Sequence, residues 1–189
     1  MFKLKIIIAS TRPGRQGPAV ANWIFGVCKG HPSFEVEMID LAEINLPFLD
    51  EPKHPRLKQY VHEHTKSWSR TIEEGDAFII VTCEYNFGYP APLKNALDYL
   101  YVEWNYKAVG FVSYGGIAGG TRAVQQLKQI VTAQKMMPVT ESVNIPFFTK
   151  HIGQDGKFNA DEHMTNSAKD MLGELSKCTA ALRSLRKSD

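Results

Sequence analysis

The run Ala77-Phe78-Ile79-Ile80-Val81 is the feature that most constrains how this chain can fold. Every residue in the run is apolar, so an extended segment here has no side that suits water. A strand that is apolar on both sides is typical of a parallel sheet with helices on both faces. The short β-branched run from Lys3 to Ile8, followed by the turn-forming residues of Ser10–Gly17, predicts a second buried strand. Both runs indicate an α/β fold.

Extended and helical patterns alternate along the rest of the chain. We expect further strands at residues 34–41, 108–113 and 137–143, and helices at 18–30, 56–74, 93–100, 120–134 and 161–186. Asn159 and Glu162 resemble a capping box at the start of the last helix. Its apolar residues recur at steps of four and three, which fits a coiled coil or, our preferred interpretation, a helix lying on a sheet. Five strands that alternate with helices predict a three-layer α/β/α sandwich with a five-stranded parallel sheet, formed by residues 1–189 as a single domain.

The charge balance and the cysteines exclude several classes of function. The 189 residues include 22 basic and 20 acidic side chains, and a formal net charge of +2 does not suggest binding to nucleic acid or a membrane surface. The three cysteines form no C-x-x-C pair and do not resemble a secreted disulfide framework. No apolar run approaches the roughly 18 residues of a membrane span. We therefore expect a cytoplasmic protein.

Residues suited to a ligand follow three of the predicted strands. Ser10–Gly17 places hydroxyls, glycines and two arginines before a helix N-terminus, which favours a phosphate group. Cys83–Pro92 offers aromatic rings and an amide to a flat heterocycle, and the four glycines of Ser113–Gly120 allow the backbone to approach a ligand closely. Each loop alone is also explained as an ordinary turn. Together they predict a ligand site at the carboxyl edge of the sheet.

The longest recognisable pattern is Glu84-Tyr85-Asn86-x-Gly88-x-Pro90-x-x-Leu93-Lys94-Asn95-Ala96-x-Asp98-x-Leu100. With the loops around it, this pattern resembles the NAD(P)H-dependent FMN reductases of the flavodoxin-like superfamily, which include quinone, chromate and azo-dye reductases. The resemblance spans about residues 4–140. It implies a flavodoxin-like fold, FMN as the cofactor and NADPH or NADH as the hydride donor.

The resemblance also implies which residues bind the cofactor. Those expected to hold the FMN phosphate are Ser10, Arg12, Gln16 and Gly17. Those expected to line the isoalloxazine and the ribityl chain are Glu84, Tyr85, Asn86 and Gly88, while Ser113, Gly115 and Gly116 belong to the loop whose glycines lie under the ring. Because the flavin itself carries the reaction, no catalytic side chain and no metal are expected.

Four positions near the expected site have more than one interpretation. Cys83 stands where the family often has proline, as a redox-sensitive thiol or as an inert buried residue. Asn95 and Asp98 lie within the helix that follows the flavin loop, and they are interpreted as residues that cap this helix and pack it against the loop, not as groups for proton chemistry. Arg15 is either a contact for the 2′-phosphate of NADPH or a solvated side chain.

Two further clusters lie outside the three loops. His62 and His64 have i,i+2 spacing, which on a helix points the imidazoles apart, so with His54 they do not predict a metal site. The aromatic segment Tyr99–Tyr106 is explained by core packing or by a subunit interface. Because members of the resembling family are commonly dimers, we interpret it as the interface of a homodimer or of a dimer of dimers.

The favoured function is an FMN-dependent NAD(P)H oxidoreductase that reduces quinones or other small acceptors by ping-pong hydride transfer. A flavodoxin-type electron carrier that acts through redox partner proteins is the alternative, and a flavin-binding module without turnover is a third. The nearly balanced charge argues against the carrier, since such proteins rely on electrostatic steering.

Overall fold

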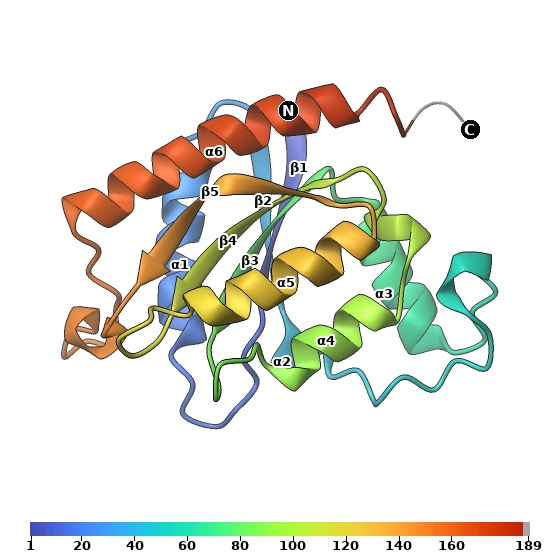
Figure 1. The fold of residues 1–189 in the computed structure, drawn as a ribbon, viewed down its shortest axis with the longest axis horizontal. Coiled ribbons are helices and arrows are strands. Elements are labelled where there is room, and N and C mark those ends of the chain that lie inside the picture. Colours follow the sequence, from blue (N-terminus) through green and yellow to red (C-terminus); the bar gives the residue numbers. More distant parts are fainter. Residues whose placement is uncertain (187–189) are drawn as a thin grey trace.

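A five-stranded parallel sheet forms the centre of the computed structural model, which describes residues 1–186 (Figure 1). The strands are β1 (Phe2–Ile8), β2 (Phe34–Asp40), β3 (Ala77–Cys83), β4 (Ala108–Tyr114) and β5 (Met137–Ile145), in the order β2-β1-β3-β4-β5. The helices are α1 (Gly17–Lys29), α2 (Leu41–Ile44), α3 (Glu63–Glu73), α4 (Ala91–Asp98), α5 (Thr121–Ala133) and α6 (Glu162–Leu182). Three short 3-10 helices occupy Pro55–Leu57, Val102–Trp104 and Phe148–His151. The predicted parallel α/β sandwich is confirmed.

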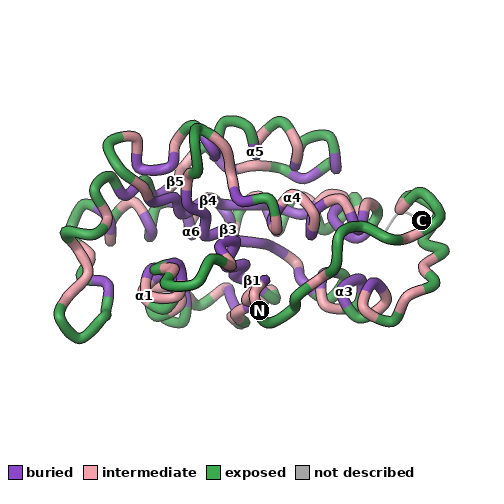
Figure 2. Tube along the Cα trace, turned by 90° about the horizontal axis from the view of Figure 1, so that it is seen from below, coloured by how far each residue is buried: buried purple, intermediate pink, exposed green. Residues whose placement is uncertain are grey.

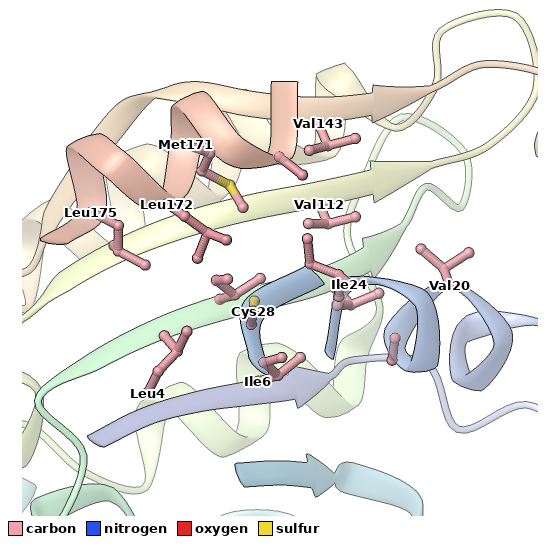
Figure 3. Close-up of a cluster of buried hydrophobic side chains, with 14 of the residues drawn as sticks. Leu4, Ile6, Val20, Ile24, Cys28, Val112, Val143, Met171, Leu172 and Leu175 are labelled. Carbon is pink, nitrogen blue, oxygen red and sulfur yellow. The ribbon is translucent and has the colours of Figure 1, made fainter. Parts of the chain in front are cut away.

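Two apolar cores lie on the two faces of the sheet. On one face α1 and α6 cover the strands, with Ile24 of α1 and Met171 of α6 fully buried (Figure 3). On the other face α3, α4 and α5 pack with Trp68, Leu97 and Leu127 against the sheet. The buried residues accordingly concentrate along the strands between the helical layers (Figure 2). The last helix lies on the sheet as expected.

The ends of the helices follow local sequence signals. Pro18 stands in the first turn of α1, and Gly30 is its C-cap. The predicted capping box at Asn159 is wrong, because the N-cap of α6 is Asp161, whose carboxylate accepts a hydrogen bond from the Met164 N–H at 2.8 Å. The Asn159 N–H instead donates to the carbonyl of His151 at 2.8 Å, within the turn that precedes α6.

The long helix predicted over residues 56–74 is also wrong in its first half. Lys58 has a left-handed φ of 49° and His62 is extended, so the helix begins only at Glu63. Because His62 precedes the helix, its ring stacks on that of His64 with centroids 5.2 Å apart, and both face Asp50. The expectation that the two rings point apart therefore fails. Residues 1–186 contain no cluster of three or more histidine, cysteine or acidic side chains suited to hold a metal ion.

The aromatic segment after α4 belongs mainly to the core. Tyr99 and Trp104 are fully buried, and the Trp104 ring packs edge-on against Trp68 and Phe78. The interpretation of these two residues as subunit interface is therefore wrong, because the chain's own fold covers them. None of the helices within residues 1–186 has the length and apolarity needed to cross a membrane.

Candidate functional site

The carboxyl ends of β1, β3 and β4 bring the three predicted loops together. β1 lies between β2 and β3, so the chain reverses its direction of travel across the sheet at this point, which is where open α/β sheets bind ligands. The loops at residues 10–17, 84–90 and 115–120 lie at the end to which the strand arrows point (Figure 1). A cavity of about 170 Å³ opens between them. It is lined by Arg12, Arg15, Gln16, Cys83, Glu84, Tyr85, Tyr114, Gly115, Gly116 and Phe148.

The loop after β1 is packed tightly where helix α1 begins. Ser10 is buried, and its hydroxyl accepts a hydrogen bond from the Tyr114 hydroxyl at 3.2 Å. A Cβ on Gly17 would lie 2.5 Å from Ser10 Oγ and 2.8 Å from the Tyr114 hydroxyl, so only glycine fits there. The start of α1 can thus approach the Ser10 side chain closely, with its N-terminal dipole at the cavity.

Three arginines surround this end of the sheet, and two of them are held by carboxylates. The Arg15 guanidinium donates to both carboxylate oxygens of Asp40, at 2.6 and 2.5 Å, and to the Ser10 carbonyl at 2.7 Å. The hydrogen bonds to Asp40 raise the pKa of Arg15, and together with the bond to Ser10 they hold the loop in place. Arg122 is paired with Glu84. Arg12 is exposed and, among residues 1–186, pairs with no carboxylate, so its charge is available to an anion.

The loop after β3 contains a tight turn. The Tyr85 and Gly88 backbones exchange two hydrogen bonds, at 2.8 and 2.9 Å, around Asn86 and Phe87. Both central residues have positive φ, 50° for Asn86 and 71° for Phe87, as in a type I′ turn. Asparagine suits this conformation, but phenylalanine rarely adopts it. The Arg122 guanidinium lies 3.9 Å from the centre of the exposed Phe87 ring and covers it.

Glu84 connects this turn to helix α5. Its carboxylate accepts from Arg122 Nε at 2.6 Å and from the Arg122 backbone N–H at 3.2 Å. The Glu84 side chain is 7% exposed, although it was predicted to line the flavin. It does line the cavity, but its oxygens fix the position of two loops relative to each other. Sequence reasoning missed Arg122, because its pairing with Glu84 is visible only in three dimensions.

The glycine-rich loop after β4 combines two kinds of glycine. Gly119 and Gly120 have positive φ, and a Cβ on Gly120 would lie 2.9 Å from that of Ser113. At Gly116 a Cβ would meet nothing within 4 Å, so this glycine faces open space at the cavity. Ser113 is buried and its hydroxyl bonds to the Gly119 carbonyl at 2.8 Å, which shapes the loop.

The chain after β5 completes the cavity wall. The Phe147 and Phe148 N–H groups donate to the carbonyls of Gly116 and Gly115, at 3.0 and 3.3 Å. The Phe148 ring packs edge-on against Tyr114, with ring centroids 5.0 Å apart. Sequence reasoning did not identify Tyr114 or Phe148 as site residues. Tyr114 was discoverable as the residue that ends the β4 pattern, whereas nothing in the local sequence marks Phe148.

Cys83 is a buried part of the cavity floor. Burial raises the pKa of its thiol, while hydrogen bonding with Tyr85 and Tyr114 acts in the opposite direction. A thiol that stays protonated at neutral pH is a weak nucleophile. This environment supports the inert interpretation over the redox-sensitive one.

Asn95 holds a different segment from the one expected. Its amide donates to the Pro47 carbonyl at 2.6 Å, and its carbonyl oxygen accepts from the Leu49 N–H at 3.0 Å. It therefore ties α4 to the loop after α2, rather than to the flavin loop. Asp98 pairs with Lys94 on the surface of α4.

Comparison with known proteins identifies the family. Residues 2–150 match the model of the NADPH-dependent FMN reductase family. An NAD(P)H-dependent FMN reductase of Schizosaccharomyces pombe is 40% identical over 169 residues, which cover 80% of this chain and 84% of the relative. An NAD(P)H:quinone oxidoreductase of Solanum tuberosum is 29% identical over 171 residues, covering 88% and 84%. In fold, the chain is similar to the flavoenzyme FerB, an NAD(P)H:acceptor oxidoreductase from Paracoccus denitrificans (TM-score 0.72, 19% identity, 97% and 98% covered).

The chain therefore belongs to the NADPH-dependent FMN reductase family, and it is an oxidoreductase whose cofactors are FMN and a reduced nicotinamide. The residues present suit FMN. Arg12 and the start of α1 offer positive charge to a phosphate, and Gly116 leaves open space beside the cavity where a side chain would stand. The flavodoxin-like sheet order places these features at the switch point.

Proposed function

We propose that this protein uses bound FMN to oxidise NADPH or NADH and to reduce quinones or other small acceptors. The observation that carries the proposal is the convergence of Arg12, Tyr85 and Gly116 on one cavity at the switch point of the sheet. The similarity to a plant enzyme named as a quinone oxidoreductase supports the acceptor class. We place this activity in the cytoplasm.

The chain's own residues bind and orient the reactants in this proposal. FMN, when bound, supplies the redox chemistry by accepting a hydride and releasing electrons to the acceptor. Arg12, Gln16 and the N-terminus of α1 bind the phosphate, and Ser10 and Gly17 shape that subsite. Tyr85, Asn86 and Gly88 form the turn beside the ring, while Gly115 and Gly116 let the ring approach the backbone. We propose ping-pong kinetics, because the nicotinamide and the acceptor would enter the same cavity in turn.

Spectroscopy and steady-state kinetics test the proposal. The purified protein should be yellow, release FMN on denaturation, and oxidise NADPH or NADH when a soluble quinone is added. Double-reciprocal plots at several quinone concentrations should be parallel. Protein loaded with FMN that oxidises neither nicotinamide, yet accepts electrons from a separate reductase, would instead identify an electron carrier. A protein that cannot be reconstituted with FMN would contradict both functions.

Alanine variants separate the site from the rest of the surface. Tyr85→Ala and Asn86→Ala should weaken FMN binding or turnover, because both change the turn beside the ring. His62→Ala and His64→Ala serve as controls, since both histidines lie beside Asp50, away from the cavity. Normal FMN binding in both site variants would contradict the placement of that turn.

We also propose a homodimer or a dimer of dimers, which the family resemblance supports. Phe87, Ile117 and Phe147 are exposed apolar residues on the loops around the cavity, and a partner subunit would remove them from water. Light scattering at micromolar concentration should give at least twice the 21.3 kDa chain mass. A monomer would contradict this assignment without affecting the proposed chemistry.

A further inference from the structure

Tyr114 lies beneath the proposed phosphate subsite, in contact with residues from two other loops. It is the last residue of β4 and is 3% exposed, yet its side chain reaches the loop after β1. The ring is supported by Phe148, and the hydroxyl meets Ser10 Oγ at 3.2 Å. The side chains of Ser10 and Tyr114 are thus hydrogen-bonded to each other next to the start of α1.

The direction of this hydrogen bond determines whether the Ser10 hydroxyl can donate a hydrogen bond to another group. The Tyr114 hydroxyl donates its single proton to Ser10 Oγ, so the proton of Ser10 remains for another acceptor, and in the contact with Cys83 the protonated thiol donates to the phenol oxygen. Burial raises the pKa of Tyr114 further above its ordinary value of 10, so the phenol is protonated and able to donate at neutral pH. The Ser10 carbonyl is occupied separately by Arg15 Nη1. Ser10 is therefore held as a donor group.

The packing at Gly17 keeps both hydroxyls next to the helix terminus. A Cβ at this position would overlap both oxygens, so the first turn of α1 rests directly on the Ser10–Tyr114 pair. The N–H groups of a helix terminus attract an anion, and a serine hydroxyl beside them adds a further donor.

We propose that Tyr114 is a positioning residue of the phosphate subsite, which orients the Ser10 hydroxyl toward the phosphate and so makes the protein favour FMN over riboflavin. The inference rests on the proposed function, because it requires that FMN binds in this cavity. Tyr114 acts through Ser10, so its effect should appear for a phosphorylated flavin and be absent for riboflavin, which lacks the phosphate.

Titration of the apoprotein with FMN and with riboflavin, followed by flavin fluorescence, tests this role. Tyr114→Phe keeps the ring on Phe148 and removes only the hydroxyl. We expect its Kd for FMN to rise about tenfold, the scale of one hydrogen bond to a charged group, while its Kd for riboflavin stays unchanged. Tyr106→Phe is the matched control, since Tyr106 precedes β4 at the opposite end of the sheet. Ser10→Ala removes the same hydrogen bond from the other side and should reproduce this selectivity, even if Tyr114→Phe fails to fold.

A double-mutant cycle completes the test. In the Ser10→Ala background, Tyr114→Phe should cause no further loss of FMN affinity. An equal rise in Kd for both flavins, in either single variant, would show a general packing role and overturn the inference. A Tyr114→Phe effect that persists without the Ser10 hydroxyl would overturn it as well. Wild-type protein that binds neither flavin would contradict the proposed function, whereas failure of the inference alone leaves wild-type FMN binding intact.

Discussion

Single atoms decide the geometry at the start of α1. Gly17 and Gly26 lie on the same helix, but they have opposite surroundings. The missing Cβ of Gly17 leaves the space that the Ser10 and Tyr114 hydroxyls occupy, whereas a Cβ at Gly26 would meet nothing within 4 Å. Alanine substitutions at the two glycines therefore distinguish the effect of close packing on stability from the effect of helix propensity.

We expect Gly17→Ala to lower the free energy of unfolding by about 1–3 kcal/mol, because the new methyl group overlaps buried oxygens. Gly26→Ala should raise it by about 0.5–1 kcal/mol, since alanine is the better helix former at an exposed site. Urea unfolding followed by circular dichroism measures both changes. Equal effects from the two substitutions would show that α1 starts differently from the packing described above.

Lys107 is a buried amine at the opposite end of β4, with 5% of its surface exposed. Its Nζ donates to the Ile72 and Glu73 carbonyls at the end of α3, at 2.7 and 3.0 Å. Burial lowers its pKa from 10.5 to about 7. Since the folded state disfavours the charged amine, the free energy of unfolding should rise with pH between about 7 and 10.5.

Comparison with Lys107→Met isolates this effect from other titrating groups. The stability of the wild type relative to the variant should increase by up to about 1.4 kcal/mol per pH unit between pH 7 and pH 10. Chemical unfolding at four or five pH values provides the measurement. A difference that does not change with pH would mean that the amine stays charged in the folded protein.

At the level of elements, the link between Glu84 and Arg122 fixes the turn after β3 to the start of α5. A lysine at 122 would keep the charge but lose the planar group that both pairs with Glu84 and covers Phe87. We expect Arg122→Lys to raise the Kd for FMN several-fold while changing the free energy of unfolding by less than about 1 kcal/mol. Lys66→Ala, which breaks the exposed pair with Glu63, is the control. Unchanged FMN binding in Arg122→Lys would show that the link does not shape the site.

The elements were predictable where one local signal determined them. The apolar runs of β1 and β3, Pro18 in the first turn of α1 and the C-cap Gly30 lie where the sequence indicates. The region before α3 was not predictable, because Lys58 and His62 leave the helical conformation in a polar segment without an apolar period. The end of β5 was also placed two residues early, because its partner Tyr114 extends the pairing to Ile145.

The three loops of the site were predictable as a group, but the bonds within them were not. Residues suited to a ligand mark the ends of β1, β3 and β4, and the parallel sheet brings those ends together. The pairs Ser10–Tyr114 and Glu84–Arg122 join residues 104 and 38 positions apart. Such pairs depend on the register of neighbouring strands, which periodicity along one segment does not encode.

For the molecule as a whole, the burial of Trp104 means that this residue should affect the stability of the fold but not the assembly of subunits. Its ring packs with Trp68 and Phe78, and its indole N–H donates to the Leu97 carbonyl at 3.2 Å. We expect Trp104→Ala to lower the free energy of unfolding by about 3–5 kcal/mol, as for other large core residues. Under conditions where the variant remains folded, light scattering should show the same assembly as for the wild type. Dissociation of the assembly without a loss of stability would instead indicate that Trp104 lies in a subunit interface.

Helix α6 comes after all five strands in the chain, and it covers the apolar face of β4 and β5. Its Met171 lies directly over Gly110, where a Cβ would be 2.9 Å from the methionine sulfur. On the ribosome, the five strands are therefore synthesised before their cover exists. The apolar face that includes Val112 and Val143 (Figure 3) stays uncovered until α6 leaves the exit tunnel. At this late stage of translation nearly the whole sheet can form, while the part of the face that α6 covers is still exposed to aggregation.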